Sequence, residues 1–358
     1  MLVNTRRKTR PVFLGKVQIG GDAPVSVQSM TSTDTRDVGK TLAQIRRLEK
    51  AGCEIIRIAV PDEEAAAAIP KIRKKIHTPL IADIHFQHRL AIMAIEAGVE
   101  GIRINPGNMK RKTIPEVVKA AREHGTVIRI GVNAGSVEKD LLKKHGGPDA
   151  EALVESALGH IRLLEDLDFE QIKVSLKSSD VTVMIRAYQL LSEKVDYPLH
   201  LGVTEAGSLM RATVKSAIGI GTLLYQGIGD TIRVSVTGDP VNEIPVAYGI
   251  LRALKMRMIG PDIISCPTCG RCEIDLLKLS RAVEKRLAGR KDYLKIALMG
   301  CVVNGPGEAA EADVGIAGGR GAGMLFRKGQ IIRRVKEGDF VEALLTEIED
   351  ITKKKKEA

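Results

Sequence analysis

The sequence predicts an α/β protein with two domains, an N-terminal (β/α)8 barrel of the TIM type over residues 1–256 and a smaller C-terminal α/β domain over residues 262–358. Two observations carry this prediction. The first 240 residues alternate short β-branched runs with alanine-rich segments of helical period, and the 358-residue chain leaves about a hundred residues beyond a typical barrel. An open doubly wound sheet is the competing architecture, but its glycine-rich dinucleotide fingerprint does not follow the first predicted strand.

Eight apolar runs mark the predicted barrel strands. They cover residues 25–30, 55–60, 80–86, 101–107, 127–135, 172–179, 199–207 and 231–238, with one long gap before the sixth. The segments between them repeat apolar residues at spacings of three and four, and Gly52 and Gly98 are typical of helix C-termini. Strand–helix alternation implies parallel strands joined by right-handed crossovers, so eight such units predict a closed barrel.

The sequence after a helical segment at 242–257 predicts a second compact α/β unit. Its predicted order is a strand, a cysteine loop, a helix, a strand, a second cysteine loop, two strands and a closing helix. The last two strands are expected at 313–319 and 323–335.

Charge and hydropathy argue against two classes of protein, those that bind nucleic acids and those that span membranes. The formal net charge is +11, but the first ten residues contribute four positive charges and the last six a net of three, so the 342 residues between them carry only four. With 3% aromatic residues and no Trp, base-stacking platforms are scarce, which disfavours an RNA-binding protein with a zinc-ribbon-like end. No apolar run is long enough to span a membrane and no secretory signal is evident, so we expect a cytoplasmic protein that contacts neither membrane nor nucleic acid.

Arginine recurs between β-branched residues in four predicted strands. The four are Arg57, Arg103, Arg129 and Arg233. A single buried arginine is usually part of a structural ion pair, but around a barrel these four would converge on one axis, where repulsion is costly unless an anion is present. Guanidinium groups bind phosphate oxygens bidentately, so the pattern predicts a small anionic substrate with more than one phosphate at the C-terminal mouth.

Three further residues near predicted strand ends are acid–base candidates. They are Asp83, His85 and Glu205, and for each of them holding an arginine in place is an equally good role. A metal site built from Asp83 and His85 is a weaker alternative. The sixth strand places Lys173, Ser175 and Lys177 on one face.

Four of the five cysteines lie in the last hundred residues, where two are separated by the spacing of metal-binding thiolates. Cys266 and Cys269 form this pair, and either Cys272 or Cys301 can supply a third thiolate. Spacing alone leaves structural zinc and an iron–sulfur cluster about level. Glu308, in the glycine-rich segment after Cys301, can serve as a non-cysteine ligand, and the adjoining phosphate-binding barrel favours a catalytic cluster.

Five motifs together carry a resemblance to a known family. CPTCGR (266–271), GCVVNGPGEA (300–309), PLHLGVTEAG (198–207), KVSLKSSD (173–180) and RIGVNAGS (129–136) resemble the bacterial two-domain 4-hydroxy-3-methylbut-2-en-1-yl diphosphate synthases over residues 11–350. The resemblance implies reductive opening and dehydration of 2-C-methyl-D-erythritol 2,4-cyclodiphosphate in isoprenoid precursor biosynthesis. It also implies a [4Fe–4S] cluster in the C-terminal domain and flavodoxin or ferredoxin as electron donor.

The family motifs also imply roles for individual residues. The cluster ligands are expected to be Cys266, Cys269, Cys301 and Glu308, with Cys272 an extra cysteine. The substrate-binding positions are expected at Arg57, Asp83, Arg103, Arg129, Asn133, Lys177, Glu205, Arg233 and Ser235. Glu205, with His85 behind it, is the expected proton donor. Strand parity favours Lys173 where the family motif indicates Lys177.

Barrel geometry adds an expectation about assembly. Each barrel helix runs antiparallel to its strand, so the last helix returns the chain to the face opposite the substrate mouth. We therefore expect a head-to-tail homodimer in which the cluster domain of one chain completes the barrel site of its partner. The alternative function is a phosphate-binding barrel lyase or transferase with a structural zinc domain.

Overall fold

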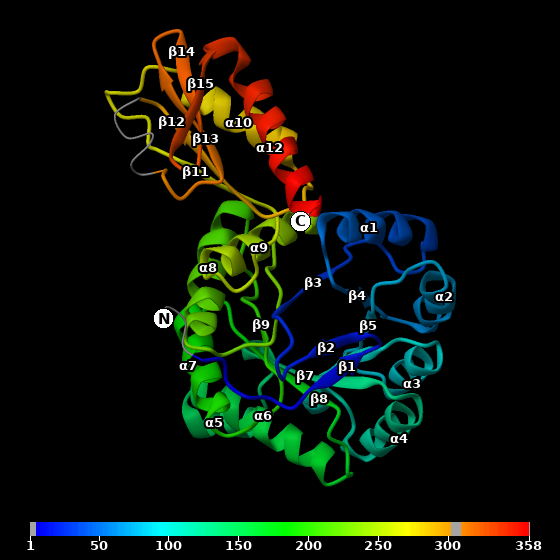
Figure 1. The fold of residues 1–358 in the computed structure, drawn as a ribbon. Helices are drawn as coiled ribbons and strands as arrows, with labels where there is room; N and C mark the ends of the chain where they lie inside the picture. The colour runs from blue at the N-terminus through cyan, green and yellow to red at the C-terminus, as the bar shows by residue number, and fades with distance from the viewer. Residues whose placement is uncertain (1–4, 302–308, 358) are drawn as a thin grey trace. The chain divides into compact units, whose positions relative to one another are not determined.

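The computed structural model describes residues 5–301 and 309–357, and the chain divides into two compact units, Met1–Arg257 and Met258–Ala358. Eight parallel strands form the barrel of the first unit (Figure 1). They are β3 (Ser26–Met30), β4 (Ile55–Ala59), β5 (Leu80–Asp83), β6 (Gly101–Ile104), β7 (Val127–Asn133), β8 (Ile172–Lys177), β9 (His200–Leu201) and β10 (Thr231–Ile232). The order is β8-β7-β6-β5-β4-β3-β10-β9, and a bridge between Val174 and Leu199 closes the ring. The predicted barrel is confirmed.

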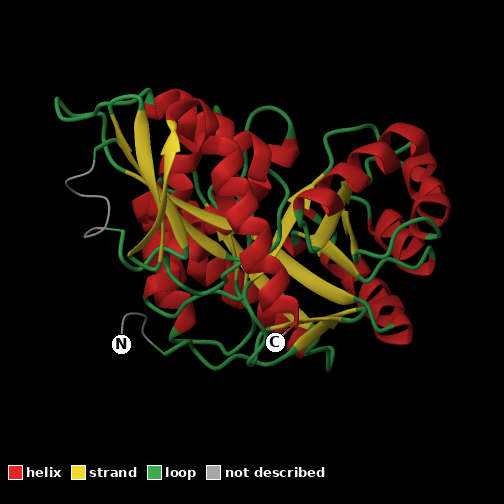
Figure 2. Ribbon diagram, turned by 45° about the horizontal axis from the view of Figure 1, so that its top comes forward, coloured by secondary structure: helices red, strands yellow, loops and turns green. Residues whose placement is uncertain are grey.

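Nine α-helices of the first unit surround these strands within the described residues (Figure 2). They are α1 (Val38–Ala51), α2 (Glu63–Arg73), α3 (His88–Glu96), α4 (Ile114–His124), α5 (Lys139–His145), α6 (Ala150–Glu165), α7 (Val181–Ser192), α8 (Leu209–Tyr225) and α9 (Glu243–Ala253). Two of them, α5 and α6, account for the long gap before the sixth strand. Across the described ranges, no helix combines the length and apolar character needed to cross a membrane.

Local signals in the sequence explain where these helices begin and end. In α1, the Asp37 carboxylate caps the first turn by accepting from the Lys40 N–H, and Gly52 ends the helix at φ 101°. A left-handed backbone of this kind is favourable only for glycine, and it directs the chain into β4. Leu42, Ile45 and Leu48 face inward at spacings of three and bury one side of the helix.

An N-terminal β-hairpin that was not predicted from the sequence covers the N-terminal end of the barrel. Strand β1 (Val12–Leu14) pairs antiparallel with β2 (Val17–Ile19). Its buried side chains pack against residues at the beginnings of barrel strands, in a cluster of Val12, Leu14, Ile19, Ile55, Ile81 and Val127. This end of the barrel is thus filled with apolar side chains, and the polar interior lies toward the other end.

The second unit is a five-stranded sheet with two helices packed on one face (Figure 2). Its elements are β11 (Pro261–Ser265), α10 (Leu276–Leu287), β12 (Leu294–Met299), β13 (Val314–Gly319), β14 (Ala322–Arg327), β15 (Gln330–Lys336) and α12 (Phe340–Glu357). Strands β11, β12 and β13 are parallel, whereas β14 and β15 run antiparallel to their neighbours. The strand expected at 323–335 is wrong: Lys328 (φ 47°) and Gly329 (φ 77°) turn the chain and divide it into a hairpin.

Candidate active site

A cationic cavity opens at the C-terminal ends of the barrel strands, where parity directs alternate side chains inward. It has a volume of about 200 Å3 and is lined by Arg57, Asp83, His85, Arg103, Arg129, Asn133, Ser175, Lys177, Thr204, Arg233 and Ser235. The fold therefore brings together every predicted barrel residue except Glu205 and Lys173, the lysine that strand parity favoured. Glu205 lines a neighbouring cavity of about 480 Å3, which shares His85, Arg103, Asn133 and Thr204 with the first. The two cavities form one site with an inner cationic part and an outer mouth.

The inner cavity has an excess of positive charge. Five of its lining side chains are cationic and only Asp83 is acidic, while a second carboxylate, Glu243, contacts Arg233 from behind. Four arginines and a lysine against two carboxylates leave a formal excess of three positive charges in a region of low dielectric constant. Such an arrangement is stable only if it has a functional counter-anion or compensating contacts elsewhere in the fold.

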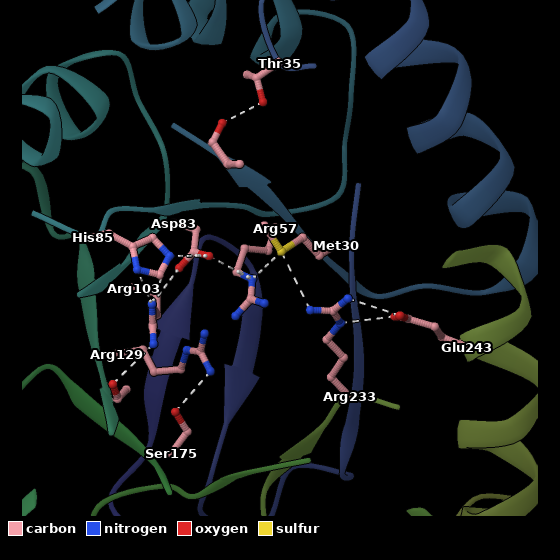
Figure 3. Close-up of polar contacts among 12 residues, drawn as sticks. Met30, Thr35, Arg57, Asp83, His85, Arg103, Arg129, Ser175, Arg233 and Glu243 are labelled. Atoms are coloured by element: carbon pink, nitrogen blue, oxygen red, sulfur yellow. Dashed lines mark hydrogen bonds and ion pairs between the residues drawn. The ribbon is translucent and has the colours of Figure 1, made fainter. Parts of the chain in front are cut away.

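Asp83 lies among three basic side chains at the end of β5. Its carboxylate is 3.4 Å from Arg103 Nη1, 3.6 Å from His85 Nε2 and 4.0 Å from Arg57 Nε (Figure 3). Burial raises the pKa of Asp83, but Arg57, the His85 hydrogen bond and Arg103 outweigh it and hold the pKa well below its usual range. Asp83 is therefore an anion at every physiological pH, and it serves to orient Arg57 and Arg103.

Of the four arginines that line the inner cavity, Arg129 has the fewest compensating contacts. It is 1% exposed, and its Nη1 donates to Ser175 Oγ at 3.1 Å (Figure 3). Its Nε and Nη2 are buried without a hydrogen-bond partner. Burial, and then the charges of Arg57 and Arg103, lower the pKa of Arg129. Two uncompensated donors on one guanidinium form the bidentate edge that a phosphate group binds.

The structure distinguishes the two lysines of β8 by depth. Lys177 borders the inner cavity, whereas Lys173 is not among its lining residues and has a buried amine without a partner. A Cβ at Gly202 would lie 2.9 Å from Lys177 Nζ, so glycine at that position makes room for the lysine. Burial, followed by the charge of Arg129, lowers the pKa of both amines well below the usual value. This geometry favours Lys177 as the residue that meets a ligand.

Arg103 of β6 contacts two residues of the neighbouring strand β7, Gly131 and Asn133. With its amide oxygen toward the arginine, Asn133 accepts from Arg103 Nη2 at 3.1 Å, and the same nitrogen donates to the Gly131 carbonyl at 3.3 Å. A Cβ at Gly131 would lie 2.4 Å from Arg103 Nε, so only glycine permits this approach. Asn105 Nδ2 donates to Ser136 Oγ at 2.8 Å and ties the two loops together.

Glu205 and His85 occupy the outer mouth. Glu205 has a left-handed backbone (φ 53°), which is uncommon for a non-glycine residue and concentrates at functional sites. The His85 side chain is half exposed, and both of its ring nitrogens lie within 3.4 Å of Arg103 Nη1. Both groups have the exposure that a proton donor needs to exchange protons with solvent.

Two residues behind the cations were not predicted from the sequence. Glu243, at the start of α9, binds Arg233 through both carboxylate oxygens. Met30 Sδ lies 3.1 Å from Arg57 Nε and 3.7 Å from Arg233 Nη1, between the two guanidinium groups (Figure 3). Glu243 lies outside the eight predicted strands and Met30 is apolar, so neither carried a signal of its own.

In the second unit, the cysteines gather where β11 and β12 end. Cys266 directly follows β11, and Gly300, just after β12, donates its N–H to Cys266 Sγ at 3.2 Å. A Cβ at Gly300 would lie 2.4 Å from Cys272 Sγ, so this thiol also packs against Gly300, beside the buried Cys301. Cys272 Sγ is 3.3 Å from the Ile274 carbonyl.

Cys269 differs from these thiols because it is exposed. Its pKa is lowered by hydrogen bonds from the Arg271 backbone and then the Arg271 side chain, which stabilise the thiolate that a metal requires. Glu308 lies outside the described residues. Within residues 5–301 and 309–357, no three Cys, His, Asp or Glu side chains are already arranged to hold a metal ion.

Two family models match the chain, one for each unit. The model described as the GcpE TIM-barrel domain matches residues 9–248, and the model described as the GcpE protein C-terminal domain matches residues 262–350. Together they cover most of the sequence, including every predicted site residue.

Curated relatives match along nearly the whole chain. A relative from Geobacter sulfurreducens is 58% identical over 98% of this chain and 99% of its own. Another from Caldanaerobacter subterraneus is 60% identical, again over 98% and 99% of the two chains. A third, from Nitratidesulfovibrio vulgaris, is 61% identical over 96% of this chain and 89% of its own. All three are named 4-hydroxy-3-methylbut-2-en-1-yl diphosphate synthase (flavodoxin).

Solved structures with similar folds are much more distant in sequence. A dihydropteroate synthase from Stenotrophomonas maltophilia has a TM-score of 0.51 and 15% identity, and covers 69% of this chain and 98% of its own. A 3-dehydroquinate dehydratase from Geobacillus kaustophilus has a TM-score of 0.50 and 13% identity, over 70% and 99% of the two chains. At these identities the likeness shows the fold alone.

Proposed function

The chain belongs to the GcpE family, and from this premise we propose that it reductively opens and dehydrates 2-C-methyl-D-erythritol 2,4-cyclodiphosphate to 4-hydroxy-3-methylbut-2-enyl diphosphate. The family membership confirms the resemblance that the five motifs carried. The reaction consumes two electrons and releases one oxygen atom of the substrate as water. It is a step in the synthesis of isoprenoid precursors, and the chain is an iron–sulfur oxidoreductase.

The single observation that carries the assignment is the cationic cavity. A cyclic diphosphate is small and carries its negative charges on two adjoining phosphates, so it complements a 200 Å3 site with an excess of three positive charges. The free edge of Arg129 and the ammonium of Lys177 bind phosphate oxygens. Arg57 and Arg103, oriented by Asp83, bind from the neighbouring strands. These contacts fix the sugar carbons relative to the mouth, which lowers the entropic cost of reaction.

Protons for the departing oxygen come from the outer mouth. Glu205 is our proposed donor because it is exposed and borders the outer cavity. His85 is the second candidate, and its contacts with Asp83 and Arg103 suit it to holding the arginine. Asp83 itself is excluded as an acid because its pKa lies well below its usual range.

The cysteines of the second unit fit an iron–sulfur cluster chemically. Soft thiolates are the ligands that such clusters require, and Cys266, Cys269 and Cys301 would hold a [4Fe–4S] cluster, with Glu308 on the fourth iron. When bound, the cluster supplies single electrons. Cys272 remains outside this proposed ligand set because the family motif has no ligand at its position.

Metal analysis tests this assignment against the zinc alternative. Anaerobically purified protein is expected to be brown, to contain about four iron atoms and four acid-labile sulfides per chain, and to give an iron–sulfur electron paramagnetic resonance signal on reduction. Stoichiometric zinc without sulfide would contradict the proposed function and favour a barrel lyase or transferase with a structural zinc domain.

Ligand binding is expected to be coupled to proton uptake at Lys177. Burial and the charge of Arg129 lower the pKa of this amine, so the unliganded protein releases the proton as the pH rises through the lowered pKa. A bound diphosphate restores the charge, so binding takes up a proton and affinity falls above that pH. Calorimetry with inorganic diphosphate in buffers of different ionisation enthalpy measures the uptake. Lys177→Met should lower it, and equal uptake by both proteins would count against this role.

The electron donor and the assembly complete the proposal. Flavodoxin stands in the relatives' names, so we assign it as donor, with ferredoxin as the alternative. The chain acts as a head-to-tail homodimer in which each barrel is completed by the partner's cluster domain, because barrel topology returns the chain to the face opposite the mouth. Its location is proposed to be the cytoplasm, where thiols stay reduced.

Mixing two inactive variants tests the assembly. A Cys301→Ala chain and an Arg129→Ala chain are each expected to be inactive. After subunit exchange at equal amounts, half of the dimers are mixed and each holds one intact site in trans, so activity should return to about a quarter of the wild-type value. Mixing Cys301→Ala with Cys269→Ala is the control and should restore nothing. No recovery in the first mixture would exclude active sites formed in trans.

A further inference from the structure

Glu243 is, beside Asp83, the second buried carboxylate at the cationic site. It is 1% exposed and accepts from Arg233 twice, from Nε to Oε2 and from Nη2 to Oε1, each at 3.1 Å (Figure 3). We infer that Glu243 is a positioning residue for the reaction proposed above, acting on the substrate only through Arg233. This inference rests on the proposed function and adds a residue to it.

The place of Glu243 explains why a carboxylate is needed there. The ladder between β3 and β10 consists of only two residue pairs, Thr231 with Ser26 and Ile232 with Val27. Beyond these two pairs, hydrogen bonds to the Glu243 side chain connect the segments of β3 and β10 in place of backbone pairing. Ser29 Oγ, on β3, donates to Oε2 at 2.7 Å, and the Val236 N–H, after β10, donates to Oε1 at 3.3 Å. Four donors thus converge on one carboxylate at the opening between two barrel strands.

These contacts determine which edge of Arg233 faces the ligand. Glu243 occupies Nε and Nη2, while Nη1 lies 3.7 Å from Met30 Sδ, the sulfur that also accepts from Arg57 Nε. Arg233 therefore presents a single nitrogen beside Arg57. Arg129 provides the contrast, because its Nε and Nη2 are free. Arg129 thus offers two neighbouring nitrogens, a full bidentate edge, whereas Arg233 offers one nitrogen at a defined place.

Charge also favours a positioning role over an affinity role. A carboxylate this close to the cavity repels an anionic substrate, so Glu243 lowers the affinity that the five cations provide. The benefit of retaining it is geometric, since catalysis depends on placing the reacting carbon accurately while binding depends mainly on total charge. Removing the negative charge should therefore slow turnover without weakening anion binding.

A matched control exists at the opposite end of the barrel. Glu54 accepts from Arg257 Nη2 at 2.8 Å and Nη1 at 3.1 Å, and from the Val27 N–H at 2.8 Å. This pair repeats the chemistry of Glu243 with Arg233 and a backbone N–H. Neither Glu54 nor Arg257 lines the inner cavity.

The test compares Glu243→Gln and Glu54→Gln in the full-length, cluster-loaded protein. For Glu243→Gln we expect kcat to fall at least ~10-fold, as for other residues that orient a binding group. The Kd for inorganic diphosphate should rise by less than ~3-fold, because the cavity gains net positive charge. For Glu54→Gln, both constants should stay within ~2-fold of wild type while the melting temperature falls.

Two results would overturn the inference: a kcat for Glu243→Gln within ~3-fold of wild type, or a fall in kcat that Glu54→Gln reproduces. If Glu243→Gln does not fold, Ser29→Ala removes one hydrogen bond and keeps the charge. Its kcat should fall ~3- to 10-fold with an unchanged Kd, and an unchanged kcat would reject the role. A wild-type protein without turnover would contradict the proposed function and the inference with it.

Discussion

Arg129→Met is expected to stabilise the unliganded protein and to abolish diphosphate binding. Arg129 is 1% exposed, has two partnerless N–H donors and is surrounded by cations, so its burial costs free energy of folding. Replacing an uncompensated buried charge by an apolar side chain of similar length should raise the free energy of unfolding by about 1–4 kcal/mol. The same change removes the free bidentate edge from the cavity and should cost about 2–5 kcal/mol of diphosphate binding, a roughly 30-fold to several-thousand-fold loss.

Thermal unfolding and calorimetry with inorganic diphosphate measure the two effects. Arg257→Met is the control, since it breaks a bidentate pair with Glu54 away from the cavity. It should lower the melting temperature and leave diphosphate affinity unchanged. An Arg129→Met protein that is less stable than wild type, or that binds diphosphate equally well, would show that Arg129 has a structural role only.

Cys301→Ala is expected to eliminate the cluster, whereas Cys272→Ala should retain it. The Cys272 thiol packs against Gly300 and Cys301 directly follows Gly300 in the sequence, but only Cys301 belongs to the proposed ligand set. A cluster that has lost one of its three thiolates is no longer stably bound to the protein. The iron and sulfide contents per chain should therefore fall to near background, and the enzymatic activity should fall with them. Iron and sulfide per chain, with the reduced-state resonance spectrum, measure the result.

The comparison also determines which cysteine supplies the third thiolate. Both variants exchange a half-buried or buried thiol for a methyl group, so a general packing defect should affect them alike. If Cys272→Ala loses the cluster and Cys301→Ala keeps it, the proposed ligand set is wrong. Wild-type iron content in both would place the ligands elsewhere.

Much of the barrel could be predicted because its elements obey local rules. Each of the eight predicted strands has a counterpart in the structure, since a β-branched run followed by a helix of period 3.6 admits few other arrangements. Parity along a strand also predicted that Arg57, Arg103, Arg129 and Arg233 would share an interior. In the structure all four line one cavity.

Other features depend on contacts distant in the sequence, which no local pattern signals. The β1–β2 hairpin is two strands of three residues, and packing against Ile55, Ile81 and Val127 stabilises it. Glu243 resembles any acidic residue at the start of a helix until Arg233 and Ser29 are placed beside it. Strand parity favoured Lys173, but Lys177 lines the cavity, because the two lysines share one face and differ in their depth along it.

Turnover of the cyclodiphosphate is the decisive test of the proposed function. The cluster-loaded, full-length protein is incubated anaerobically with 2-C-methyl-D-erythritol 2,4-cyclodiphosphate and a reduced one-electron dye, and the product is identified by mass spectrometry. We expect 4-hydroxy-3-methylbut-2-enyl diphosphate, with one oxygen atom lost and two electrons consumed per molecule of substrate. Unchanged cyclodiphosphate after incubation with protein that contains the cluster would contradict the proposed function.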